Sequence, residues 1–213
     1  MKRKLVLLCA MLFMTVTLLS QKTMIGINAG ILFSMTKISQ GTRTIVSQNR
    51  TGFNAGIVAN IPVAEWFSFQ AGLSFLQKGS NRTEMGVDVS TEWVSLNYLE
   101  LPLNFLYHTK GRYGSFEIGA GPSFSYGLSA KGKFFINTIT SVEKLHFGSN
   151  ADDYLKRFEF GANMLAGFQF TNGLFINAVY NIGLSNVAGY SEDKWKNYYQ
   201  GFRIGYFFKD KKK

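Results

Sequence analysis

Cysteine is almost absent from this sequence, since Cys9 is the only one among 213 residues. Cys9 lies within the first 20 residues, which we expect to be removed on export. The mature chain would then contain no disulfide and no reactive thiol. Lipid modification of Cys9 is disfavoured as well, because the large Leu8 precedes it and the apolar run continues to Leu19.

Charged residues and proline are also scarce. Asp, Glu, Lys and Arg make up 17% of the chain, against roughly a quarter in an average soluble domain. The chain has 3 prolines but 20 phenylalanines and 22 glycines, a balance that favours an all-β membrane protein. The net charge of +10 is concentrated at the ends, in Lys2, Arg3, Lys4, Lys209, Lys211, Lys212 and Lys213. Since no basic stripe alternates with aromatic residues, we expect no nucleic-acid partner.

Long apolar runs are missing after the N-terminus. Residues 1–20 combine a basic start with an apolar core, which predicts a secretory signal peptide. The alternative for this segment is an uncut membrane anchor. From residue 21 onward no run approaches the roughly 18 apolar residues that a candidate spanning helix needs. The sequence therefore predicts an exported protein without a transmembrane helix.

What the sequence does contain is alternation. In residues 98–107, Leu99, Leu101 and Phe105 share one side while Glu100 and Asn104 share the other. A period of two predicts a β-strand with two different environments. The pattern recurs in eight segments, at residues 24–34, 50–60, 66–78, 94–108, 115–128, 157–170, 174–187 and 198–208. The bulky side chains are too many for a small interior, so we expect them to face lipid.

These segments predict an all-β fold, an eight-stranded antiparallel up-and-down transmembrane β-barrel. The barrel would occupy residues 21–208, after the signal peptide 1–20 and before a lysine-rich periplasmic tail at 209–213. The alternative fold, a soluble lipid-carrier barrel, would have to place too many large side chains inside. Pro102 and Pro122 fall within predicted strands and predict a bulge at each position.

The connections between the predicted strands alternate in length. Long ones are expected at residues 35–49, 79–93, 129–156 and 188–197, and short ones at 61–65, 109–114 and 171–173. Outer-membrane barrels have long extracellular loops and short periplasmic turns. The sequence thus predicts a protein of the outer membrane with both termini in the periplasm.

Five stretches carry a family resemblance: residues 75–79 (FLQKG), 98–102 (YLELP), 119–122 (GAGP), 180–187 (YNIGLSNV) and 205–208 (GYFF). With them, the chain resembles the PorT-type outer-membrane β-barrel family of Bacteroidetes, whose members are called porin family by fold. The resemblance implies an eight-stranded barrel and a role in the cell envelope. One branch of that family is tied to type IX protein secretion, and no motif assigns this chain to it.

Charged side chains on the polar faces form the first candidate site. We expect Lys78, Glu100, Glu117, Glu159 and Arg203 to point inward and to form a salt-bridge network that fills the interior. Arg203 would close onto Glu159 or Glu117. The alternative interpretation of the same residues is a path for ions or protons.

Aromatic residues near strand ends form the second candidate site. We expect Trp66, Trp93, Tyr107, Trp195, Tyr198 and Tyr199 to lie at the membrane–water interface, where amphipathic rings are favoured. Tyr198, Tyr199 and Trp195 could instead form a contact patch.

The sequence gives little sign of catalysis. His146 has Ser149, Asp152 and Asp153 nearby, which we interpret as loop composition, and His108 ends a predicted strand. No zinc-ligand spacing, phosphate loop or dinucleotide fingerprint occurs. We therefore expect no enzyme activity, no cofactor and no metal.

The expected function is a structural or interaction role, through the extracellular loops or within an envelope or secretion assembly. Residues 133–140 alternate, could extend two strands above the membrane, and would then offer an exposed β edge to a partner. Expected partners are outer-membrane lipid and envelope or secretion proteins, around a monomeric barrel. The alternative function is a narrow porin-like channel for small solutes.

Overall fold

The computed structural model describes residues 23–84, 89–136, 139–148, 154–189 and 193–208. The predicted signal peptide, residues 1–20, and the predicted tail, residues 209–213, lie outside the described residues.

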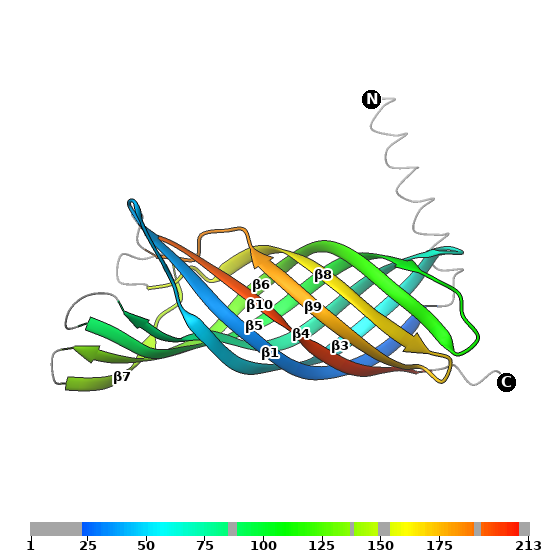
Figure 1. Ribbon diagram of the computed structural model, residues 1–213, viewed down its shortest axis with the longest axis horizontal. Helices are drawn as coiled ribbons and strands as arrows, with labels where there is room; N and C mark the ends of the chain where they lie inside the picture. The colour runs from blue at the N-terminus through cyan, green and yellow to red at the C-terminus, as the bar shows by residue number, and fades with distance from the viewer. Residues whose placement is uncertain (1–22, 85–88, 137–138, 149–153, 190–192, 209–213) are drawn as a thin grey trace, which may run out of the picture.

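The described residues form ten strands: β1 (Met24–Gln40), β2 (Arg43–Val46), β3 (Gln48–Ala64), β4 (Phe67–Glu84), β5 (Val89–His108), β6 (Gly114–Ile136), β7 (Ile139–Leu145), β8 (Phe158–Phe170), β9 (Leu174–Gly183) and β10 (Asp193–Phe208). Eight of them pair antiparallel in the order β10-β9-β8-β6-β5-β4-β3-β1, and β10 pairs with β1 to close a ring (Figure 1). The predicted eight-stranded, antiparallel, up-and-down β-barrel is therefore confirmed. β2 and β7 pair with β1 and β6 outside this ring.

Alternation along each strand sorts the side chains between two surfaces. In β1, Ile25, Ile27 and Ile31 are exposed on the outside while Asn28 and Leu32 are buried in the interior. In β5, Leu99, Leu101 and Phe105 point outward and Glu100 and Asn104 point inward. A β structure in a lipid bilayer needs two features, apolar side chains on its outside and a closed ring without a free edge. This barrel has both. No helix in the described part of the chain is long and apolar enough to cross a membrane.

The strands run further than predicted at one end of the barrel. β4 continues to Glu84 and β5 begins at Val89, so most of the loop predicted at 79–93 is paired strand. β6 extends to Ile136 and β10 begins at Asp193, within two other predicted loops. Backbone pairing continues where the apolar outer face ends, because strand hydrogen bonds do not depend on side-chain polarity. Hydrophobic alternation alone therefore underestimated the lengths of β4, β5, β6 and β10, whereas β9 ends at Gly183, short of the predicted end at residue 187.

The predicted bulges at Pro102 and Pro122 are wrong. Ser74 pairs with Glu100 and Ala71 with Leu103, so the register is the same on both sides of Pro102. Pro122 pairs with Ala162 in an unbroken register between β6 and β8. A β-carbon added at Gly72 would lie 3.3 Å from Cγ of Pro102, so the absence of a side chain at Gly72 leaves room for the proline ring.

Three short connections and both described chain ends lie at one end of the barrel. The short connections join β3 to β4, β5 to β6 and β8 to β9, and Ile25 pairs with Phe208 at the same end. At the opposite end, β4, β5, β6 and β7 continue beyond the ring as a sheet (Figure 1). We call these the short-turn end and the long-hairpin end.

Side chains fill the interior of the ring. Val58, Phe175 and Phe207 form a small apolar cluster against Met24 near the short-turn end. A larger cluster includes Leu32, Leu76, Leu96 and Tyr98. Glycines make this packing possible, since a β-carbon at Gly205 would lie 2.2 Å from Cζ of Phe175. The interior is thus a packed core, as expected for eight strands.

Candidate functional site in the barrel interior

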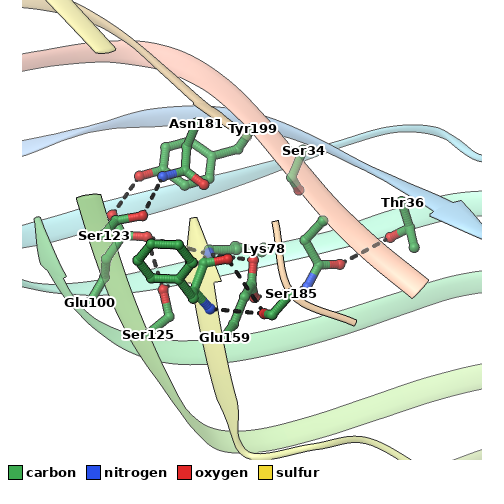
Figure 2. Close-up of polar contacts among 12 residues, drawn as sticks. Ser34, Thr36, Lys78, Glu100, Ser123, Ser125, Glu159, Asn181, Ser185 and Tyr199 are labelled. Carbon is green, nitrogen blue, oxygen red and sulfur yellow. Dashed lines mark hydrogen bonds and ion pairs between the residues drawn. The ribbon is translucent and has the colours of Figure 1, made fainter. Parts of the chain in front are cut away.

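Lys78 of β4 stands at the centre of a buried charged cluster. Its Nζ lies 3.4 Å from Oε2 of Glu100 and 3.5 Å from Oε1 of Glu159. Figure 2 shows the three side chains converging from β4, β5 and β8. Lys78 and Glu100 are each 1% exposed and Glu159 is 4% exposed, so water cannot replace these contacts.

Neutral side chains hold the two carboxylates in place. The Tyr199 hydroxyl donates to Oε1 of Glu100 at 2.5 Å, and Ser125 donates to Oε2 at 3.0 Å (Figure 2). The Asn197 amide donates to Oε2 of Glu159 at 3.0 Å. Buried carboxylates remain ionised only when their oxygens are paired or hydrogen-bonded, and here each carboxylate has both a cation and a polar donor.

Two aromatic rings complete the surroundings of Lys78. Its Nζ lies 4.8 Å from the centroid of Tyr98 and 5.1 Å from that of Tyr199. Ring faces attract a cation at these distances, and more strongly where water is absent. The cluster draws on β4, β5, β6, β8 and β10, so it ties together strands that are far apart in the ring. Chemically it can brace the barrel and block its interior.

Glu117 belongs to a second, separate cluster near the short-turn end. It is fully buried, and its Oε1 lies 3.3 Å from Nδ1 of His108, which is directly opposite it in register. The other ring nitrogen of His108 lies 2.6 Å from the Ser68 hydroxyl. A Ser–His–Glu arrangement can activate a nucleophile, but Ser68 is 1% exposed and a substrate cannot reach it. The arrangement places the His108 ring beside a buried carboxylate whose two oxygens have no hydrogen-bond partner among the described residues.

Arg203 does not close onto Glu159 or Glu117, and this expectation is corrected. Among the described residues, Arg203 takes part in no ion pair, and Lys78 is the cation that pairs with Glu159. The register places Asn177 and Gly167 between Arg203 and Glu117 across β9 and β8. Arg203 points into the interior and is half-buried, and its Nε is buried without a hydrogen-bond partner among the described residues.

The six predicted interface aromatics divide into two groups. Trp66 and Tyr107 are exposed and stack with ring centroids 6.4 Å apart near the short-turn end. Trp93 lies under the Arg50 guanidinium at 5.0 Å, and Tyr198 is half-buried on the outer face.

Tyr199 and Trp195 are corrections to that prediction. Tyr199 is buried and bonds to Glu100, while Trp195 packs against the larger interior cluster and donates to Asn197. In a strand, neighbouring residues point to opposite faces, so Tyr198 and Tyr199 cannot share one environment.

The contact of His108 with Ser68 and Glu117 was not predicted from the sequence, which placed His108 only at the end of a strand. His146, the other histidine, is exposed, and its sequence neighbours Ser149, Asp152 and Asp153 lie outside the described residues. Counting residues outward from the 109–113 connection would place His108 opposite Gly114, so the true partner, Glu117, follows only from the register of the folded pair. Within the described ranges, no group of three or more His, Cys, Asp or Glu side chains could hold a metal ion.

A family model and several solved structures are similar to this chain. A family model described as "Outer membrane protein beta-barrel domain" matches residues 19–189. The chain is similar to Ail, the attachment invasion locus protein of Yersinia pestis, with 14% identity, a TM-score of 0.40, and coverage of 86% of this chain and 98% of that chain.

It is also similar to Neisserial surface protein A, with 12% identity, a TM-score of 0.47, and coverage of 86% and 97%. OprG from Pseudomonas aeruginosa gives 12% identity, a TM-score of 0.49, and coverage of 88% and 97%. No curated protein matches the sequence.

Proposed function

Because the chain belongs to the outer membrane protein β-barrel domain family, we propose that it is a monomeric, non-catalytic outer-membrane barrel that binds a partner polypeptide at its long-hairpin end. The observation that carries this proposal is the open edge of β7. β7 pairs with β6 and, among the described residues, with no second strand. Ile139 and Val142 on this strand are 71% and 62% exposed.

An exposed strand edge presents unpaired N–H and C=O groups to any extended peptide that lies beside it. Natural proteins usually protect such an edge with charges, prolines or a covering loop. The apolar side chains of Ile139 and Val142 would instead stabilise a complex with a partner strand that buries them, because burial of apolar surface is favourable. A segment of another envelope or extracellular protein is therefore the expected ligand.

The packed interior supports binding over transport. Lys78, Glu100, Glu159, Tyr98 and Tyr199 occupy the barrel from several sides and are buried. A narrow channel for small solutes, the alternative function, would need these side chains to move apart.

We further propose that the long-hairpin end faces the outside and that both termini lie in the periplasm. Short turns on the periplasmic side and long outer loops are the usual arrangement of outer-membrane barrels. The resemblance to the PorT-type family of Bacteroidetes favours a partner within an envelope or secretion assembly.

Site-specific photo-crosslinking in intact cells tests the proposal. A photoreactive phenylalanine analogue at Val142 should give an adduct of defined mass, because this side chain would lie beside the bound strand. The matched control is the same analogue at Tyr113, which is 73% exposed at the short-turn end. Adding Ile139→Lys should abolish the Val142 adduct. Equal adducts from both positions, or persistence after Ile139→Lys, would contradict edge binding.

A further inference from the structure

We propose that the barrel carries a binding site for the phosphate of a membrane lipid on its outer face. A pocket of about 280 Å³ lies there between β6, β7 and the segment that follows β7. Four nitrogen-bearing basic side chains line it: Lys131, Lys144, His146 and Arg157. No Asp or Glu lines this pocket, so its charge is uncompensated from within.

Lys131 and Lys144 are directly opposite each other in the β6–β7 pair. Like charges in directly opposed positions destabilise a sheet. Neither lysine forms an ion pair with a carboxylate in the described part of the chain, whereas the nearby Lys133 lies 2.6 Å from Glu92. An anion between the two ammonium groups would convert this repulsion into attraction.

Arg157 is held in place before any ligand arrives. Its Nη2 donates to the Phe147 carbonyl at 2.6 Å, and its guanidinium lies 5.6 Å from the Tyr126 ring. A guanidinium has five N–H donors in a fixed fork that matches phosphate geometry. Since one nitrogen is anchored, the remaining donors are positioned at the pocket with little further loss of side-chain freedom.

The pocket borders the apolar outer surface of the barrel. Tyr126, Leu128 and Phe158 are exposed there, and Leu128 itself lines the pocket. Phe158 follows Arg157 directly in the chain. A ligand that fits both surfaces has a phosphate at one end and acyl chains at the other. A soluble phosphate would use the charged half alone, which is why we assign the site to a lipid headgroup.

The chain contains a matched control for this site. Lys37 and Lys196 are directly opposed in the β1–β10 pair near the same end of the barrel. They repeat the cross-strand pairing of Lys131 and Lys144, but neither lines the pocket that Lys131 and Lys144 share. If nonspecific surface charge causes lipid binding, both lysine pairs should contribute equally. If the pocket causes it, only Lys131 and Lys144 should contribute.

The test is native mass spectrometry of the full chain folded in detergent, titrated with bisphosphorylated lipid A. We expect Lys131→Gln with Lys144→Gln to weaken binding about tenfold or more, since each basic group at a membrane surface contributes about a factor of five. Lys131→Arg with Lys144→Arg should retain binding, and Lys37→Gln with Lys196→Gln should leave it unchanged. Every variant is first shown to run as a folded barrel on an unheated gel.

Three results would overturn the assignment. Equal weakening by the Lys37 and Lys196 changes would mean diffuse surface charge. Equal binding of fully dephosphorylated lipid A would mean apolar contact alone. Displacement of the lipid by inorganic phosphate at a comparable concentration would mean a soluble-anion site. The site uses side chains on one face of the β6–β7 pair, including Lys144, whereas the proposed partner binding uses the backbone edge of β7 at Ile139 and Val142. Failure of the lipid test would therefore leave the proposed partner binding untouched, and a negative crosslinking result would leave this site untouched.

Discussion

Lys78 shows how a single residue can determine the state of the interior. It is the cation shared by Glu100 and Glu159, and all three side chains are buried. Forming such a cluster contributes little net stability, because desolvation offsets the attraction. Breaking it is different, because it leaves charges buried without a partner.

Lys78→Met should lower the free energy of unfolding by about 3–5 kcal/mol, the usual cost of removing one partner from a buried ion pair. The measurement is urea-induced unfolding of the refolded barrel in lipid vesicles, followed by tryptophan fluorescence. The triple variant Lys78→Met, Glu100→Gln and Glu159→Gln should recover much of the loss, because no unpaired charge remains.

An exposed ion pair supplies the control for this experiment. Lys110 and Glu65 also pair, but their side chains are 58% and 63% exposed. Lys110→Met should therefore cost less than about 1 kcal/mol. Similar losses for Lys78→Met and Lys110→Met would show that burial does not govern the energetics of the Lys78 cluster.

At the scale of elements, the β6–β7 hairpin is an addition to the barrel. β7 pairs with β6 beyond the ring, and the ring closes through β1 and β10 without it. Ring strands pair on both sides, whereas β7 pairs on one side within the described residues. Its contribution to closure of the ring should accordingly be small, although Leu145 belongs to the larger interior cluster, and its open edge fits a role in recognition.

Shortening this hairpin tests its independence. Replacing residues 133–142 with Asn-Gly would join Gly132 to Glu143, which are already register partners, through the turn that two-residue hairpins prefer. We expect the shortened chain to fold and to keep its heat-modifiable gel mobility. Because the change also removes Phe134, which packs against the larger interior cluster, it should lower the free energy of unfolding by about 3 kcal/mol or less. Loss of folding would mean that the hairpin nucleates the barrel.

For the whole molecule, the packed interior predicts an electrically closed barrel. In planar bilayers the chain should give no reproducible conductance steps. A variant with Lys78, Tyr98, Glu100, Tyr199, Phe175 and Phe207 all changed to serine should give steps. It removes the side chains that meet at the middle of the barrel and those that fill its short-turn end. Gel mobility confirms that the variant is folded. Steady channels from the parent chain would favour the alternative, a narrow porin-like pore.

Alternation along the chain determined much of this architecture. The period-two pattern separated Leu99, Leu101 and Phe105 from Glu100 and Asn104, and the structure has the same two faces. It indicated eight ring strands because each must cross the same apolar layer. Strand ends beyond that layer were missed, as at β4 and β5, because pairing there leaves no apolar signature.

By itself, the sequence determined which face of each strand is apolar. That pattern in turn determined that the strands close into a barrel and that the barrel lies in a membrane. Only the tertiary structure decided which inward groups meet. In the folded barrel, Lys78 pairs with Glu100 and Glu159, and Glu117 pairs with His108. The tertiary structure also places Lys131 opposite Lys144 beside Arg157. The physical reason is that alternation is a local property of one strand. Contacts across a barrel depend on register, strand tilt and closure, which are set by all the strands together.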